Sequence, residues 1–123
     1  MTSIRVLVAN RPRLIRELLM ATISDQPDIE IVGEIPEESD ILGAVEASLP
    51  DFLIIALDKS KRLPPFCMSI LQENPQIKVI AISPNTNSFM CYCTSLQIQS
   101  YPIEASEAGV LNALRGKTFE RVQ

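Results

Sequence analysis

The chain has 123 residues, of which 46% are hydrophobic and only 5% aromatic, so it is long enough for one domain with an aliphatic core. Its net charge of −4 argues against a surface that binds nucleic-acid phosphates, because such a surface needs clustered Lys and Arg. It contains no histidine, which removes the commonest general base and the commonest metal ligand.

The cysteines and the first residues indicate where the protein works. Cys67, Cys91 and Cys93 are an odd number of cysteines and follow no spacing typical of a zinc site, which favours a reducing compartment. Residues 1–25 carry charges every few positions, so neither a signal peptide nor a membrane span is expected there. We therefore expect a cytoplasmic protein without membrane contact.

The first half of the chain alternates short apolar runs with helical periodicity. The valine-rich run Ile4–Ala9 predicts a buried strand, and residues 11–24 place their apolar side chains on one stripe, as in an amphipathic helix. A second strand is predicted at Ile29–Ile35. The stretch "EESD" then supplies capping oxygens for a second helix that reaches Leu49.

The second half continues this alternation. Strands are predicted at Phe52–Leu57, Ile77–Ile82 and, more weakly, Ile98–Tyr101; helices are predicted at Pro64–Asn74, from Asn85 to Leu96, and from a cap at Ser106 to a terminator at Gly116.

Five β–α units in succession predict an α/β fold. Continuous apolar strands alternating with helices are typical of a parallel sheet that is covered on both faces. We expect a doubly wound five-stranded parallel sheet of (βα)5, flavodoxin-like topology in residues 1–116. Residues 117–123 are then a C-terminal tail or the start of a linker. Ligands of such folds bind beyond the carboxyl ends of the strands, but the chain has neither a Gly-rich dinucleotide turn nor a P-loop.

Three phrases, "IRVLVANRP", "DQPDIEIVGEI" and "LPDFLIIAL", together with the five β–α units, resemble response-regulator receiver domains of the branch that precedes helix-turn-helix output domains. The resemblance covers residues 3–115 and implies a role in two-component signal transduction and transcription regulation. In that family an acidic pair after the first strand holds Mg²⁺, and an Asp that ends the third strand accepts a phosphoryl group. A Ser or Thr that ends the fourth strand senses the phosphoryl group, and a Lys that ends the fifth pairs with it.

Most of these groups are missing when the family pattern is carried over. The acidic pair falls on Ala9 and Asn10, and the phosphoacceptor falls on Ala56. Ser83 matches the hydroxyl position, but the lysine position falls on Tyr101. The resemblance therefore implies a degenerate pseudo-receiver. Mg²⁺ binding is not expected, because hard cations depend on the charge of their oxygen ligands.

Two other readings of the same end of the sheet stay open. Asp58 becomes the phosphoacceptor if the third strand is shifted by two residues. Alternatively, Arg11, Lys59, Lys61 and Arg62 form a cationic rim that binds a small anion or a phosphorylated ligand. No constellation for catalysis on an external substrate is visible, so we do not expect an enzyme.

The stretch "SFMCYCTSL", Ser88–Leu96, is apolar around more than one side if it is helical. The core stripe would then hold Phe89, Cys93 and Leu96. In a helix Cys91 and Cys93 point about 200° apart, so we expect small buried hydrophobic residues rather than a redox pair.

The resemblance also implies where partners bind. In the family, the surface made by the fourth helix, the fifth strand and the fifth helix docks partners and dimerises. Phe89, Met90, Tyr92 and Tyr101 are therefore a possible interface with a signalling protein, an output domain or a second copy. We expect a signal-transduction module that has lost Mg²⁺-dependent aspartyl phosphorylation and works through protein–protein contacts, without binding nucleic acid directly.

Overall fold

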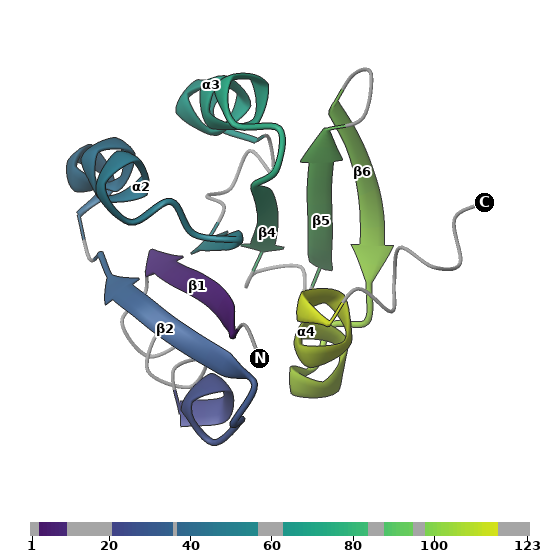
Figure 1. Ribbon diagram of the computed structural model, residues 1–123. Coiled ribbons are helices and arrows are strands. Elements are labelled where there is room, and N and C mark those ends of the chain that lie inside the picture. The colour runs from purple at the N-terminus through teal and green to yellow at the C-terminus, as the bar shows by residue number, and fades with distance from the viewer. Residues whose placement is uncertain are drawn as a thin grey trace.

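The computed structural model describes residues 3–9, 21–35, 37–56, 63–83, 88–94 and 98–115, which form one open sheet flanked by helices (Figure 1). The strands are β1 (Ile4–Ala9), β2 (Ile29–Glu34), β3 (Phe52–Ala56), β4 (Lys78–Ser83), β5 (Ser88–Thr94) and β6 (Ile98–Ile103). The helices are the 3-10 turn η1 (Glu38–Asp40) and the α-helices α2 (Ile41–Ser48), α3 (Pro65–Glu73) and α4 (Glu107–Leu114); residues 21–24 are also helical.

Four of the six strands form the predicted parallel part of the sheet. The strand order is β2-β1-β3-β4-β5-β6, and the pairs β1–β2, β1–β3 and β3–β4 are parallel. The chain moves from β1 to β2 in one direction and from β3 to β4 in the other. The direction of winding therefore reverses between β1 and β3, which is the place where ligands bind in folds of this kind.

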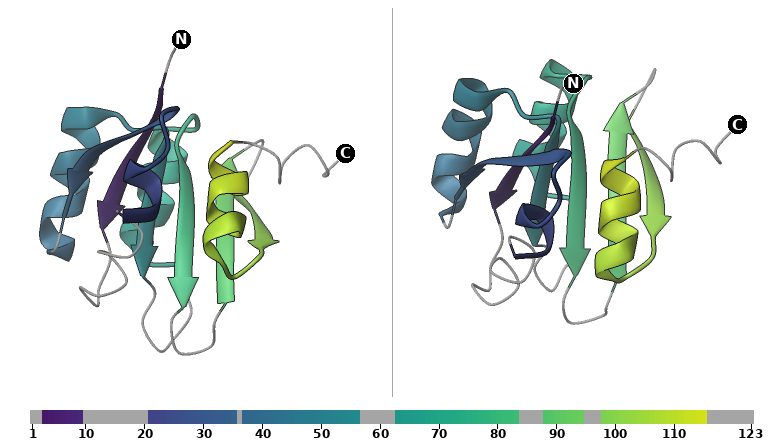
Figure 2. Two further views of the ribbon diagram at one scale, coloured as in Figure 1. Left: turned by 90° about the horizontal axis from the view of Figure 1, so that it is seen from below. Right: turned by 60° about the horizontal axis from the view of Figure 1, so that its bottom comes forward.

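Both faces of the sheet are covered, as the uninterrupted apolar strands predict. One face packs against residues 21–24 and α4, and the other packs against α2 and α3 (Figure 2). The first cluster is centred on Val6, Val8, Ile54, Ile80, Ile82, Cys91 and Val110, and the second on Leu7, Leu53, Ile55, Val45, Ile70, Leu71 and Val79. Each fully buried aliphatic side chain contributes roughly 1.5–3 kcal/mol, so these clusters are the main source of stability.

The prediction of a helix at residues 85–96 is wrong. Residues 88–94 form β5, which pairs antiparallel with β4 and with β6, so the sheet is mixed and has six strands instead of five parallel ones. Alternation along β5 sends Phe89 and Cys91 into one core cluster and Tyr92 into the other. Because a central strand needs apolar groups on both faces, a segment that is apolar on several sides suits β5 as well as a helix.

The start of α4 agrees with the sequence. The Ser106 side chain accepts a hydrogen bond from the Gly109 backbone N–H at 3.0 Å, which satisfies one of the free donors of the first turn. Gly109 lies so near the preceding loop that a Cβ atom there would stand 1.9 Å from the Glu104 carbonyl oxygen. The predicted terminator Gly116 and the predicted tail, residues 117–123, lie outside the described residues.

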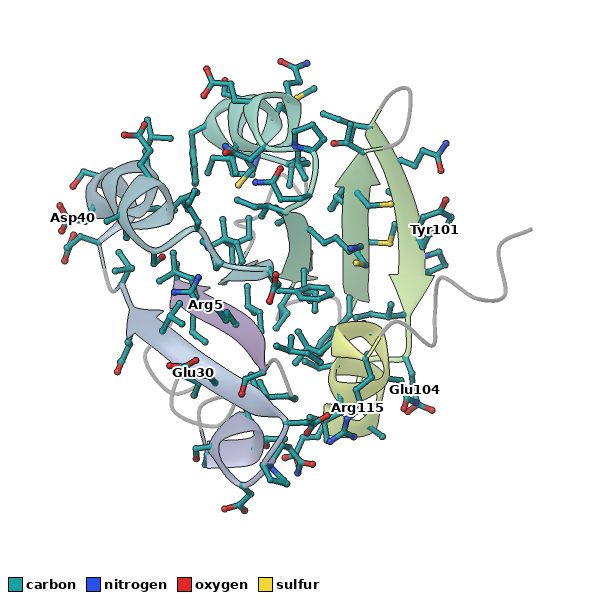
Figure 3. All side chains as sticks on the ribbon, viewed as in Figure 1. Arg5, Glu30, Asp40, Tyr101, Glu104 and Arg115 are labelled. Carbon is teal, nitrogen blue, oxygen red and sulfur yellow. The ribbon has the colours of Figure 1, made fainter. Side chains whose placement is uncertain are left out.

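Hydrogen bonds from Arg115 link the end of α4 to the turn that precedes β2. The guanidinium of Arg115 donates two hydrogen bonds to the Asp28 carboxylate, at 2.9 and 3.0 Å, and a third to Gln26 Oε1 at 2.6 Å (Figure 3). This paired geometry holds together segments that are 87 residues apart in the sequence. Within the described ranges, no helix combines the length and the hydropathy needed to cross a membrane.

Candidate functional site

The carboxyl ends of β1, β3 and β4 lie side by side and define the candidate site. Ala9 pairs with Ile55, and Ala56 pairs with Ile82, so the ends of the three strands are nearly level. Ala9 is 7% exposed and Ala56 is half-buried. Two of the three positions to which the resemblance assigns carboxylates, Ala9 and Ala56, therefore lie on neighbouring strands at the point where the winding reverses, and both carry a methyl group.

Among the described residues, Ser83 supplies the polar side chain at the carboxyl ends of these strands. It ends β4, is 5% exposed, and is the one buried polar residue in the part of the chain that the structure describes. It pairs with Ser88, the first residue of β5, and strand alternation places it on the face of Ala81, toward α3. A hydroxyl can donate one hydrogen bond and accept others, but it brings no charge to balance a cation.

No metal-binding cluster is present among the described side chains, since they hold no group of three Asp, Glu, His or Cys that could ligate one ion. Ala9, Ala56 and Ser83 together offer one neutral oxygen. Mg²⁺ is held in proteins through one or two carboxylates together with water, and none of these three side chains is a carboxylate, so they do not form such a site.

Tyr101, at the predicted lysine position, is not brought to Ser83. It pairs with Cys91, which pairs with Ile80, so it stands three residues short of Ser83 along the sheet and two strands away. With strands about 4.8 Å apart and about 3.3 Å per residue, the two backbones are roughly 14 Å apart. Figure 3 shows Tyr101 on the outermost strand.

The residue that follows this outer strand and is level with Ser83 is an acid. Phe89 pairs with Ile103, and Ser88 with Ser83, so the residue after Ile103, Glu104, falls at that level. Its carboxylate accepts a hydrogen bond from the Ser106 hydroxyl and is exposed (Figure 3). Sequence reasoning missed Glu104, because it had no reason to expect a strand between β4 and β6.

Asn10, the second position of the acidic pair, lies in a part of the chain that the structure does not describe. The same holds for the residues of both alternative readings, Arg11, Asp58, Lys59, Lys61 and Arg62. The cationic rim and the shifted phosphoacceptor therefore stay predictions. The strand that precedes Asp58 ends at Ala56, in register with β4.

The predicted interface residues do not share an outer helix face. Phe89 and Tyr92 lie on opposite faces of β5, a strand inside the sheet, and each packs against a different core cluster. Met90, on the same strand, is half-buried. Only Tyr101 of the four belongs to a strand at the edge. The expected interface depends on the fourth helix of the family, which the sequence predicts at residues 85–96 and which is not the helix labelled α4. In the described residues, strand β5 stands in its place.

The cysteines of β5 share one face, contrary to the helical prediction. Strand alternation places Cys91 and Cys93 on the same side. Burial, reinforced by the neighbouring Cys93, raises the pKa of the Cys91 thiol to about 12, and burial also raises the pKa of Cys93. Both therefore remain protonated at neutral pH. Cys91 is 0% exposed and fits the prediction of a small buried hydrophobic residue.

One solved structure is similar to this fold over two thirds of both chains. The signal receiver domain of NarL from Mycobacterium tuberculosis superposes with a TM-score of 0.56 and 23% sequence identity, covering 68% of each chain. No protein-family model matches the chain, and no curated protein matches it. At this identity the likeness establishes the fold: a receiver-like α/β arrangement with a mixed six-stranded sheet.

Proposed function

We propose that this chain is a receiver-like signal-transduction module that works through protein–protein contacts and has lost Mg²⁺-dependent aspartyl phosphorylation. The observation that carries the proposal is the pair Ala9 and Ala56 at the ends of neighbouring parallel strands. These are the positions to which the resemblance assigns a Mg²⁺ ligand and the phosphoacceptor.

Charge explains why these two positions matter. A receiver concentrates Mg²⁺ with several carboxylates, and the cation neutralises the phosphoryl group during its transfer. Methyl groups at both positions supply neither the ligand charge nor a nucleophile. Ser83 alone can sense a phosphoryl group only if another residue accepts one.

Ala9 and Ala56 also affect whether phosphorylation can switch the conformation of the module. A ligand shifts a conformational equilibrium only by its difference in affinity for the two states. Without aspartyl phosphate, the module is held in one state or is switched by a protein partner. We propose that this partner is a signalling protein, an output domain or a second copy, and that the chain is not an enzyme.

The test is an amide NMR titration of the ¹⁵N-labelled chain with millimolar Mg²⁺ and then with beryllofluoride, a mimic of aspartyl phosphate. We expect no shifts at Ala9, Ala56 and Ser83. The matched control is the triple variant Ala9→Asp, Asn10→Asp, Ala56→Asp, which restores the three carboxylates and is expected to shift with Mg²⁺. Saturable shifts in the unmodified chain would contradict the proposal.

The alternative with Asp58 as phosphoacceptor has its own signature. Incubation with acetyl phosphate would then add the mass of one phosphoryl group, and Asp58→Asn would abolish this gain. We expect an unchanged mass after long incubation. A mass gain that depends on Asp58 would replace the proposed function with a working phosphorylation site.

A further inference from the structure

The two edges of the sheet differ in how they are protected against pairing with another strand. The outer strand β2 carries exposed Glu30 and Glu34 and an irregular register, in which Val6 pairs with Ile31 but Leu7 pairs with Gly33 (Figure 3). Charges and bulges are the usual means of protecting an edge strand. By contrast β6, "IQSYPI", has no charged residue and pairs with β5 without interruption over six residues, so its one protecting feature is Pro102, because proline also limits the pairing of an edge strand.

Pro102 reveals which backbone groups of β6 face outward. It pairs with Met90 and has no N–H, so a hydrogen-bonded pair there would leave the Met90 carbonyl without a donor. Met90 and Pro102 therefore form a non-hydrogen-bonded pair. Since hydrogen-bonded and non-hydrogen-bonded pairs alternate, the backbone groups of Ile98, Ser100 and Pro102 point away from β5, toward the open edge.

We propose that β6 pairs antiparallel with β6 of a second copy of this chain, about a two-fold axis through Ser100. In this register Ser100 faces Ser100 of the second copy, and Ile98 faces Pro102. Two Ser100 N–H groups donate to Ser100 carbonyls, and two Ile98 N–H groups donate to Pro102 carbonyls. Because Pro102 has no N–H, the two bonds that it would donate to Ile98 carbonyls are the only ones missing between residues 98 and 102. The two six-stranded sheets then form one continuous sheet.

The side chains of β6 are compatible with this self-pairing. The register places Ile98 beside Pro102 and Gln99 beside Tyr101 of the other copy. No like charges face each other, whereas pairing through β2 would bring glutamates together on a chain of net charge −4. Gln99, Ser100 and Pro102 are exposed in the single chain. In a two-fold dimer the same surface of both copies forms the interface, so that surface must be complementary to itself. Strand β6 is complementary to itself in this register.

Topology argues against one occupant from the same chain, a parallel strand that follows α4. The connection from β3 to β4 moves along the sheet toward β6 with α3 on one face, but α4 lies on the opposite face. A strand that followed α4 and joined the outer edge of β6 in parallel would therefore need a left-handed crossover, which parallel connections avoid.

The role of this dimer rests on the proposed function, because the second copy is then the protein partner. The pairing of β6 with β6 does not itself depend on phosphorylation. Sedimentation equilibrium tests it directly: the dimer has twice the 13.6 kDa of the chain. Ser100→Lys places two like charges on the two-fold axis, and we expect it to raise the dimer dissociation constant about tenfold or more. Ser100→Thr is the matched control and should dimerise like the unmodified chain.

Hydrogen exchange supplies a second measurement that needs no variant. The Ser100 and Ile98 amides should gain protection as the protein concentration rises, while exposed amides of β2 should not. A mass of 13.6 kDa at every concentration overturns the inference, as does a dimer that Ser100→Lys leaves intact or exchange at Ser100 that is independent of concentration. None of these outcomes bears on the Mg²⁺ titration, so the two proposals fail separately.

Discussion

At Gly109 the absence of a side chain sets how closely α4 approaches the loop before it. A Cβ atom there would meet the backbone of Glu104, with its oxygen at 1.9 Å and its carbonyl carbon at 2.7 Å, and backbone cannot rotate away as a side chain can. We expect Gly109→Ala to lower the free energy of unfolding by about 3 kcal/mol, because α4 must move off its core cluster. Urea denaturation measures this loss.

Gly43 is the matched control for this substitution. It is exposed on α2, and a Cβ atom there would meet nothing within 4 Å. Gly43→Ala should therefore raise the free energy of unfolding by about 0.8 kcal/mol, through helix propensity alone. Equal effects at the two glycines would show that the contact with Glu104 does not limit the packing of α4.

Single residues of the candidate site were predictable where a strand is read from its own apolar run. Ala9 ends β1 as the apolar run Ile4–Ala9 predicts. β3 ends at Ala56, one residue before the end of the predicted strand Phe52–Leu57, and β4 ends at Ser83, one residue after the end of the predicted strand Ile77–Ile82. Tyr101 was assigned by its place before Pro102, and that proline lies inside β6 instead of in the loop after it. The sequence holds no local signal for a proline at an outward-facing position of an edge strand.

Between elements, the link from Arg115 to Asp28 makes part of the stability dependent on pH. The hydrogen bonds from Arg115 lower the pKa of the Asp28 carboxyl below its ordinary value of 3.8. A lowered pKa in the folded state adds stability above the unfolded-state pKa, and this contribution is lost as the pH falls through the folded-state pKa. The side chains of Arg115 and Asp28 are 29% and 38% exposed, so solvent and salt weaken the effect.

Asp28→Asn tests this link. We expect the variant to be less stable than the unmodified chain at neutral pH, and the difference to shrink as the pH falls below 3.8. Thermal unfolding across this pH range, at low and high salt, measures the difference. Asp25→Asn removes an exposed acid of the same turn and is the control for the loss of one negative charge. A difference that stays constant into strongly acidic solution would contradict the assignment.

Helices α3 and α4 were predictable as elements because each has one apolar stripe and a start signal, Pro64 and Pro65 at the start of α3 and the Ser106 cap of α4. Helix α2 was predictable from its apolar stripe, but Asp40 before it makes no side-chain capping hydrogen bond. The segment 88–94 was not. Phe89 and Cys93 fit a helical stripe, while Phe89 and Cys91 fit a strand face equally well. Its aromatic, Cys and Thr residues favour a strand, but what decides is the unpaired edge of β4, and no short stretch of sequence displays that edge.

For the molecule as a whole, the doubly wound half was predictable and the end of the sheet was not. The order β2-β1-β3-β4 is that of the flavodoxin-like topology that the sequence predicts. The similarity to the NarL receiver domain, with a TM-score of 0.56, agrees with that half of the prediction. The inserted strand changes which surface is available, since β5, a strand inside the sheet, now stands where a helix was expected.

The same inserted strand divides the molecule into a part with short-range contacts and a part with long-range ones. Ser83 pairs with Ser88 and Thr94 with Ile98, whereas Val6 pairs with Phe52, 46 residues away. Closing a short loop costs less chain entropy, so we expect β4, β5 and β6 to assemble first and to present an edge on which β3, β1 and β2 are added. In stopped-flow experiments Cys91→Ala should then mainly slow folding, and Val6→Ala should mainly accelerate unfolding. The reverse pattern would place the nucleus in the parallel half.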